Sequence, residues 1–416
     1  LYMFTNGPAG AAIYTENADS GAQGALGLFS EGLKRLRFTK AVAFDPTGSG
    51  KRNHMAILGF YPASGNKNGA AYLYIINADT NTLVKSYELD KDWFGWIGEL
   101  TTVDANNFFA ITAGDYNGDG RDSLVVYCTT FRGDGSNALK EISYDGKNWS
   151  NPVYISVSRK GHELFNKTYM EKELYKSYAL CNKLSVALES GDVNGDGIDD
   201  LVVVSTANKI SDNYANDGAK TATHPMVAVA KGQKGTKNIG ELSVQRYEPD
   251  TDTCMVTPDV SIGDINGDGI NEVVVAGVYQ VYHDLEPSDN GLVVYWVLNC
   301  EWTPTRISKQ WVLSVDDGEV SAISMGDSIR ADESNWQQFS TECVSLDGKG
   351  TKDYVFLNGY FYQWDDSSKK LVRASGSDAL DQKSNQNDSN FAFNFLVTHC
   401  NGTDVNEVFI RSAAVG

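Results

Sequence analysis

One acidic pattern recurs along the 416-residue chain and constrains its fold more than any other feature. Three ungapped copies read Gly-Asp-x-Asn-Gly-Asp-Gly and begin at Gly114, Gly191 and Gly263. Three weaker copies extend the series over most of the chain. The six acidic loops lie near positions 45, 115, 192, 264, 345 and 399. A pattern that returns every few tens of residues is typical of an array of similar structural units.

Apolar runs on both sides of the acidic loops predict β-hairpins in which each acidic loop is the turn. The run 109–113 precedes one loop, and the β-branched run 201–204 follows another. Short apolar runs without a helical period are typical of buried strands. A second hairpin follows in each repeat, most clearly over 71–87, 139–155 and 360–372.

Two hairpins in each repeat give four antiparallel strands, which is the content of a propeller blade with loop insertions. The sequence therefore predicts an all-β fold, with a single β-propeller domain over 1–416. Repeat counting gives six blades, and seven is the alternative. The last acidic loop lacks an outer hairpin, and 1–32 contains one. We expect 1–32 to complete the last blade, because this pairing closes the ring and removes a free sheet edge.

The three full copies place oxygen atoms at alternate positions, as a binding loop for a hard cation does. Positions 1, 3 and 5 carry Asp, Asn and Asp, position 7 offers a backbone carbonyl, and Gly at position 6 permits a sharp turn. Ligands that are all oxygen select Ca²⁺, so we expect about three calcium sites. The predicted ligands are Asp115, Asn117, Asp119, Arg121 and Ser123; Asp192, Asn194, Asp196, Ile198 and Asp200; and Asp264, Asn266, Asp268, Ile270 and Glu272.

The copies differ in completeness at position 9. The loop at 192 has Asp200 there, and the loop at 264 has the longer Glu272. Ser123 replaces the carboxylate in the loop at 115, so that the adjacent Asp122 or a water molecule would complete that site. The weak copies lose carboxylates, and Lys349 stands where a ligand Asp would be. We expect ordinary turns in the weak copies.

The acidic cores, each followed by a β-branched run, resemble the FG-GAP/VCBS repeats of integrin-α-like β-propellers. Ser123 departs from that pattern, and so does the absence of a clear Phe-Gly before the outer hairpins. The resemblance implies a calcium-binding, calcium-stabilised scaffold that is secreted or displayed at the cell surface and used in adhesion. It does not specify the ligand.

Composition excludes several classes of function. The chain has 35 Lys and Arg against 54 Asp and Glu, and the net charge of −19 repels nucleic acid and anionic lipid. No apolar run is long enough to span a bilayer. The six Cys are far apart and form no C-x-x-C pair, which favours buried free thiols and leaves disulfides open. The chain begins without a Met or a leader, and we interpret it as part of a larger precursor.

The direction of the strands sorts the loops onto two faces of the predicted propeller. The acidic loops and the other hairpin turns share one face. The longest segments fall on the opposite face, and we interpret them as insertions at 157–182, 206–224, 280–290, 315–341 and 375–391. Rigid scaffolds build binding faces from such loops. The candidates for ligand contact there are Trp93, Trp96, Tyr214 and Trp336.

These observations favour a non-enzymatic binding or adhesion module whose ligand is a glycan or an extracellular protein. The five His form no H-E-x-x-H motif, and no G-x-S-x-G motif follows a strand, so no catalytic residue is singled out. Carboxylates are abundant, and an acid pair for glycoside chemistry stays open. The alternatives are a carbohydrate-active enzyme, either a polysaccharide lyase or a glycoside hydrolase, and a passive spacer domain of a large surface protein.

Overall fold

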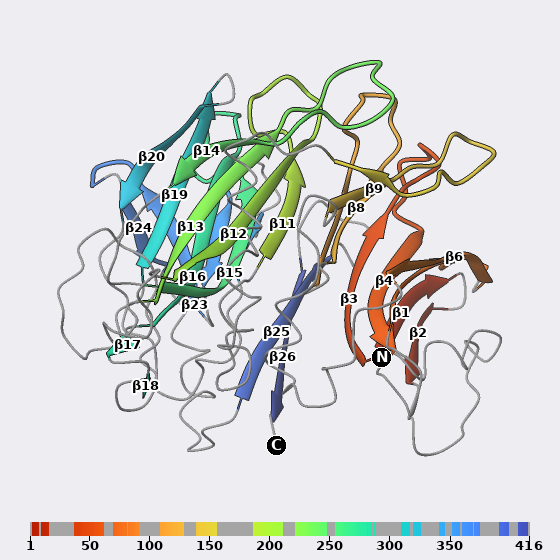
Figure 1. Ribbon diagram of the computed structural model, residues 1–416, viewed down its shortest axis with the longest axis horizontal. Coiled ribbons are helices and arrows are strands. Elements are labelled where there is room, and N and C mark those ends of the chain that lie inside the picture. Colours follow the sequence, from red (N-terminus) through yellow and green to blue (C-terminus); the bar gives the residue numbers. More distant parts are fainter. Residues whose placement is uncertain are drawn as a thin grey trace. The chain divides into compact units, whose positions relative to one another are not determined.

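A computed structural model shows the fold of the chain (Figure 1). The residues that the structure describes are 2–7, 10–15, 37–61, 70–80, 82–90, 109–128, 139–155, 186–210, 221–247, 254–280, 282–283, 286–287, 309–316, 319–325, 341–345, 352–357, 360–368, 370–374, 391–398 and 407–414. Every regular element among them is a β-strand. The predicted all-β class is confirmed for these residues.

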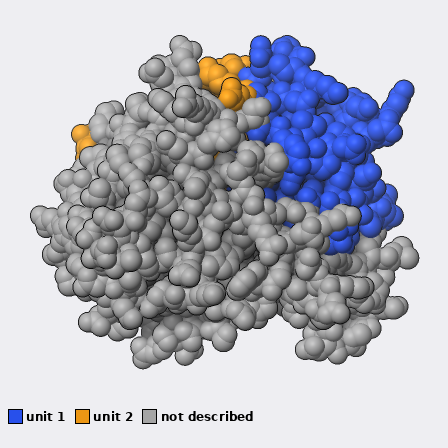
Figure 2. All heavy atoms as spheres, in the orientation of Figure 1, with its two compact units in different colours: residues 1–156, 232–240 blue, residues 157–231, 241–416 orange. Residues whose placement is uncertain are grey.

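The chain divides into two compact units, which are coloured separately in Figure 2. The first unit comprises Leu1–Ser156 and the short segment Gly232–Gly240. The second comprises Val157–Lys231 and Glu241–Gly416. Each unit is described by itself below.

The first unit contains two antiparallel sheets of four strands, and in each sheet the strands are neighbours in chain order. One sheet consists of β3 (Arg37–Phe44), β4 (His54–Tyr61), β5 (Ala70–Asn77) and β6 (Thr82–Asp90). The other consists of β7 (Phe109–Gly114), β8 (Ser123–Cys128), β9 (Leu139–Ile142) and β10 (Val153–Tyr154).

The second unit contains three further four-stranded antiparallel sheets. The first consists of β11 (Val186–Gly191), β12 (Asp200–Ile210), β13 (Thr221–Ala230) and β14 (Ser243–Tyr247). The second consists of β15 (Cys254–Gly263), β16 (Glu272–Gln280), β19 (Lys309–Asp316) and β20 (Glu319–Met325), with a small hairpin of β17 (Tyr282–His283) and β18 (Glu286–Pro287) between its middle strands. The third consists of β21 (Thr341–Val344), β22 (Tyr354–Leu357), β23 (Tyr360–Asp365) and β24 (Lys370–Arg373).

All five sheets are two consecutive hairpins, as the sequence predicts, and their strand order is that of propeller blades. Two further hairpins lie at the ends of the chain. One is β1 (Tyr2–Gly7) with β2 (Gly10–Thr15), and the other is β25 (Phe391–Thr398) with β26 (Glu407–Ala414). Each forms a two-stranded sheet. A hairpin within 1–32 is therefore present, and its closure of the last blade stays a prediction, as does the number of blades.

Several of the segments interpreted as loop insertions are partly strand. The ladder of β12 and β13 continues from Thr206↔Pro225 to Ile210↔Thr221, β17 and β18 lie within 280–290, and β19 and β20 cover 309–316 and 319–325. These parts of the predicted insertions are paired strand and not loop. Polar residues such as Thr206 and Asn208 carry no buried apolar pattern, yet their backbones pair as well as any others.

The second strand of each hairpin pair forms the core of its sheet. All six residues of β8 are buried, and 201–204 and 273–275 have no exposed surface. In the last sheet of the second unit, Val355 and Phe356 are also fully buried. Strands buried on both faces are covered by neighbouring sheets, which explains why they read as unbroken apolar runs rather than alternating ones.

Consecutive sheets within a unit contact each other through their first strands: β3 with β7, β11 with β15, and β15 with β21. Two glycines at the ends of first strands permit this approach. A Cβ added at Gly263 would lie 2.5 Å from Cβ of Cys343 and 2.7 Å from Oδ2 of Asp353. A Cβ added at Gly191 would lie 3.0 Å from Cγ2 of Ile262. The Gly before the Asp of the loops at 192 and 264 is therefore explained by sheet packing and not by the loop.

We predict that Gly263→Ala lowers the free energy of unfolding by about 1–3 kcal/mol, because the new methyl group overlaps atoms of the next sheet. Gly191→Ala is the matched control and should cost less, since the end of the Ile262 side chain can rotate away. Denaturant unfolding monitored by circular dichroism measures both. Equal stabilities for the two variants would contradict this account of the repeat glycine.

Candidate functional site

The three full acidic loops share one pattern of hydrogen bonds around the Asp at position 1. In the loop at 264, Asp264 Oδ1 accepts a hydrogen bond from Gly267 N at 2.7 Å, and Oδ2 accepts one from Gly269 N at 2.9 Å. Gly269 has a φ of 91°, a backbone conformation that favours glycine. The position-6 glycines donate to Asp115 Oδ2 at 2.8 Å and to Asp192 Oδ2 at 2.7 Å.

Positions 3 and 5 continue the same wrapping of the chain around its own side-chain oxygens. Asn266 Oδ1 accepts a hydrogen bond from Asp268 N at 2.8 Å, and Asp268 Oδ1 accepts one from Ile270 N at 2.9 Å. The loops at 115 and 192 make the equivalent bonds, at 3.0 and 2.9 Å in both. The alternate positions predicted from the sequence are thus turned toward the inside of each loop.

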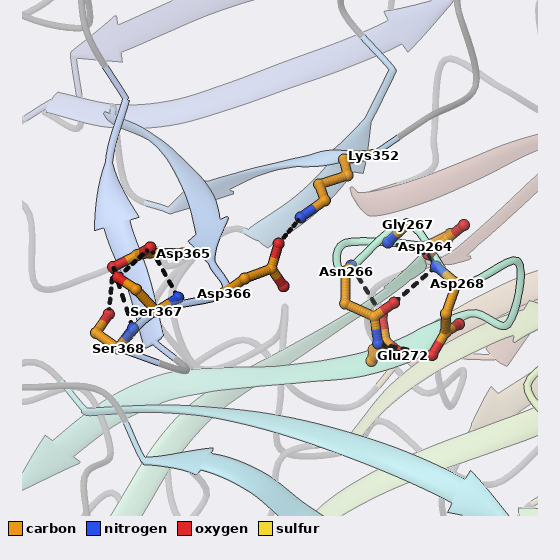
Figure 3. Close-up of polar contacts among 10 residues, drawn as sticks. All are labelled: Asp264, Asn266, Gly267, Asp268, Glu272, Lys352, Asp365, Asp366, Ser367 and Ser368. Atoms are coloured by element: carbon orange, nitrogen blue, oxygen red, sulfur yellow. Dashed lines mark hydrogen bonds and ion pairs between the residues drawn. The ribbon is translucent and has the colours of Figure 1, made fainter.

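The carboxylate at position 9 points back into the loop from the start of the second strand. Asp200 is fully buried, and its Oδ2 accepts hydrogen bonds from Val193 N at 3.2 Å and Asn194 Nδ2 at 3.0 Å. Glu272 is buried too, and its Oε1 accepts from Asn266 Nδ2 at 2.7 Å. Figure 3 shows Asp264, Asn266, Asp268 and Glu272 gathered at this turn.

Carboxylates of like charge lie close together in the loop at 264. Burial raises the pKa of Glu272 from its ordinary value of 4.5 to about 7, and the carboxylates of Asp268 and Asp264 contribute to the rise. Asn266 Nδ2 lies 3.0 Å from Asp268 Oδ2 as well as close to Glu272, so that one amide group is shared between two carboxylates. The oxygen atoms of this loop fit a hard cation, which would offset their mutual repulsion.

The weak loop at 45 satisfies its carboxylate in a different way. Thr47 Oγ1 donates to Asp45 Oδ1 at 2.7 Å, Ser49 Oγ donates at 3.2 Å, and Lys51 N donates to Oδ2 at 3.1 Å. Burial raises the pKa of Asp45, but hydrogen bonds from Thr47, the backbone of Gly50 and Ser49 lower it, and the pKa lies below its usual value. Donors occupy the positions that are acceptors in the full loops.

The turn at Asp365, between β23 and β24, resembles the loop at 45 and appears beside the loop at 264 in Figure 3. Hydrogen bonds from the side chains of Ser368 and Ser367 lower the pKa of Asp365 to about 2. Lys352 Nζ and Asp366 Oδ2 form an ion pair at 2.6 Å in the same view. Hydroxyl and ammonium groups donate to these carboxylates, whereas Glu272 accepts from the Asn266 amide group and from backbone N–H groups.

Strand register separates the full loops from two of the three weak ones. The full loops lie between the pairs Gly114↔Ser123, Gly191↔Asp200 and Gly263↔Glu272, so that each encloses eight residues, as in 115–122. The weak loops at 45 and 345 lie between Phe44↔His54 and Val344↔Tyr354, and each encloses nine, as in 45–53. The weak loop at 399 lies between Thr398↔Glu407 and encloses eight, like the full loops. The gapless sequence alignment hides this extra residue.

In the loop at 115, a neighbouring strand brings a carboxylate to the place of Ser123. Glu141 on β9 is buried and hydrogen-bonds the Ser123 side chain. Glu141 Oε2 also accepts a hydrogen bond from Ile239 N at 2.8 Å, in the segment 232–240 of the same unit. Burial raises the pKa of Glu141, and these hydrogen bonds oppose the rise. Sequence reasoning missed Glu141 because it lies outside the loop.

A second set of carboxylates lies on the first strands of the second unit. Glu189 on β11, Asp259 on β15 and Glu342 on β21 are part-buried. Burial raises the pKa of Glu342 well above its usual range, and the charges of Glu189 and Asp259 raise it further. Asp259 Oδ2 accepts a hydrogen bond from Thr341 N at 2.9 Å, which holds β21 against β15. No sequence motif identifies this set, because its members come from three repeats.

Cys343, next to Glu342, is a free thiol. Burial raises the pKa of its thiol well above the usual value, and Ser261 Oγ lies 3.3 Å from its Sγ. A thiol held in its protonated form is a poor nucleophile. Cys128 in the first unit is also free and buried. Cys128 agrees with the expectation of buried free thiols, whereas Cys343 is free and part-buried.

Several predicted residues fall outside the described part of the chain. These are Lys349, the loop at 399 and the ligand-face candidates Trp93, Trp96, Tyr214 and Trp336. Within the described residues, no group of three or more His, Cys, Asp or Glu is arranged so that it could hold a metal ion. The same residues contain no helix that is long and apolar enough to cross a membrane. Each full loop has Asn at position 3 and a backbone carbonyl at position 7, so its expected ligands are not all of those four types.

Comparison with known proteins gives only distant structural likenesses. No known family and no curated protein matches the sequence. The structure is similar to Penicillium chrysogenum α-L-arabinanase, with a TM-score of 0.39, 10% identity, and coverage of 91% of this chain and 93% of that one. Bacillus licheniformis rhamnogalacturonan lyase gives a TM-score of 0.38 and 12% identity, with coverage of 90% of this chain and 69% of that one. Fusarium graminearum α-L-arabinofuranosidase gives a TM-score of 0.36 and 6% identity, with coverage of 91% of this chain and 93% of that one. Function is therefore inferred below from the chain's own residues.

We predict that Glu272 destabilises the protein at neutral pH when calcium is chelated. A carboxyl group whose pKa is raised on folding contributes stability below pH 4.5, and that stability is lost as the pH rises through about 7. Glu272→Gln should therefore raise the free energy of unfolding in chelator at pH 8 by about 2 kcal/mol. Asp45→Asn should lower it, because the pKa of Asp45 is depressed. Denaturant unfolding at pH 5 and pH 8 measures both, and a Glu272→Gln variant less stable than wild type at pH 8 would contradict the prediction.

Proposed function

We propose that this chain is a calcium-stabilised β-propeller that acts on carbohydrate as a glycoside hydrolase or a polysaccharide lyase. The observation that carries the enzymatic part is Glu342, which lies beside Glu189 and Asp259 on the first strands of three consecutive sheets. First strands contact one another between sheets, and in a propeller the strands where blades converge surround the central channel. The three carboxylates would then share one lining.

The chemistry of this set suits acid and base catalysis. A carboxyl group that stays protonated near neutral pH can give its proton to a leaving oxygen, while an ionised carboxylate nearby acts as base or nucleophile. Glycoside cleavage uses such a pair. We assign the acid to Glu342, whose pKa is raised by burial and by its neighbours, and the second role to Glu189 or Asp259.

The proposed calcium sites are the three full acidic loops. The convergence of Asp264, Asn266, Asp268 and Glu272, with the raised pKa of Glu272, supports a cation there. The repeated hydrogen bonds support the same role for the loops at 115 and 192. Calcium bound there would neutralise the carboxylates and hold the turn between first and second strands.

The wider architecture and location follow from the same features. Five blade-type sheets in chain order, with a hairpin at each end, support a ring of six or seven blades over 1–416. Loops of this ligand type suit calcium concentrations outside the cell, so we place the protein outside the cell or at its surface, within a larger precursor. The net charge of −19 argues against nucleic acid and anionic membranes as partners.

The second candidate is a non-enzymatic binding or adhesion module. The feature that favours it is the repeated acidic core, which resembles FG-GAP/VCBS repeats. Its ligand would be a glycan or an extracellular protein, bound on the face opposite the calcium loops. Trp93, Trp96, Tyr214 and Trp336 are the candidates for contact with it.

We predict that wild type binds calcium and melts at a higher temperature with calcium than with chelator. The variant Asp192→Ala with Asp196→Ala should lose about one bound ion per chain and part of this gain. Isothermal titration calorimetry and thermal unfolding measure the two effects. Identical melting of wild type in calcium and in chelator would contradict the calcium proposal.

We predict that Glu342→Gln lowers turnover of the substrate found on a polysaccharide panel by about 10²–10⁴-fold, the range for loss of a general acid, with little change in melting temperature. Glu241→Gln, at an exposed position, is the matched control and should keep full activity. Glycan binding without turnover would favour the binding module. If the protein neither binds nor turns over any glycan, the remaining alternative is a spacer domain.

A further inference from the structure

Consecutive acidic loops are joined through the backbone of their first residue. Asp45 N donates to Asp122 Oδ2 at 2.7 Å, and Asp122 N donates to Asp45 O at 2.8 Å. Asp264 N donates to Asp353 Oδ2 at 3.1 Å, and Asp353 N donates to Asp264 O at 2.8 Å. In both cases the residue just before the second strand of one sheet holds position 1 of the preceding loop.

At the loop at 192, the residue in this place is Asn271. Its Nδ2 donates to the carbonyl oxygen of Asp192 at 2.8 Å. Asn271 directly precedes β16, as Asp122 precedes β8 and Asp353 precedes β22. The contact is made by a side-chain amide and not by a backbone N–H, so it can be removed by substitution without changing the main chain.

A second contact covers the same loop. A Cβ added at Gly195, position 4 of the loop at 192, would lie 3.5 Å from Cγ1 of Ile270. At Gly48, the equivalent glycine of the loop at 45, an added Cβ would lie 3.3 Å from Cγ of Arg121. Residues 270–271 therefore contact the preceding loop at positions 1 and 4.

Asp192, whose backbone carbonyl Asn271 contacts, is the residue on which the proposed ligand set of this loop depends most. The Asp192 carboxylate accepts hydrogen bonds from Gly195 N and Gly197 N, both at 2.7 Å, so it organises the whole turn. Its position is fixed through its own backbone, which Asn271 holds. Residues that orient the ligands of a metal without touching it typically change affinity by about 10–100-fold when they are removed.

We propose that Asn271 is a positioning residue for the calcium site at 192, although it belongs to the next loop. This inference rests on the calcium sites proposed above. Asn271 stands between Ile270 and Glu272, two expected ligands of the site at 264.

The test is a calcium titration of the full chain by isothermal titration calorimetry. Asn271→Ala should weaken one site by about 10–100-fold and leave the others unchanged. Asn271→Leu, which keeps the approximate size of the side chain but removes the donor without introducing a carboxylate like those of Asp122 and Asp353, should weaken the same site. Asn148→Ala, at an exposed turn position, is the control and should titrate like wild type.

A double-mutant cycle separates positioning from a general structural effect. In an Asp196→Ala background, which disables the site at 192, Asn271→Ala should have no effect on the remaining sites. Persistence of the loss in that background would overturn the proposal, because Asn271 would then act on its own loop or on folding. Wild-type affinity in both Asn271 variants would also overturn it, while the calcium sites would stand. A wild type that binds no calcium would overturn the calcium sites and this inference together.

Discussion

Repulsion among carboxylates at the turn between first and second strands is the constraint on which the other features of this chain depend. The full loops concentrate acidic oxygens where each sheet reverses direction, and in the loop at 264 burial, together with the charges of Asp268 and Asp264, raises the pKa of Glu272. The same turns carry the contacts between consecutive sheets, through Gly263 and through the pairing of Asp264 with Asp353. A cation that neutralises the carboxylates of these loops would therefore also stabilise the packing of consecutive sheets.

Carboxylates in this chain occur in three environments. Asp45 and Asp365 receive hydrogen bonds from hydroxyl groups and are stable as anions. Glu272 accepts hydrogen bonds from N–H groups but is buried close to the carboxylates of Asp268 and Asp264, which suits a cation. Glu342 on β21 is buried close to the charges of Glu189 on β11 and Asp259 on β15, which suits proton transfer. These differences in environment, and not the abundance of acid, distinguish turn, ion site and candidate catalytic group.

Local pattern was enough to predict the hairpins, because unbroken apolar runs such as 201–204 have only one reasonable structure beside an acidic turn. It was not enough for the register, since one extra residue in the loop at 45 leaves the motif alignable. Glu141 and the set around Glu342 depend on strands that pair or pack across repeats, and a linear pattern does not contain that information. The sequence pattern did not predict the strand pairing at 206–210, because backbone pairing does not require apolar side chains.

Amide hydrogen exchange with and without calcium tests the central claim most directly. Peptides that cover 192–200 and 264–272 should become protected when calcium is added, because their backbone N–H groups bond to the oxygens that the ion would fix. The peptide that covers 45–53 should show no change of its own, because hydroxyl donors already satisfy Asp45. Equal protection of all three loops, or no protection of any, would contradict the account.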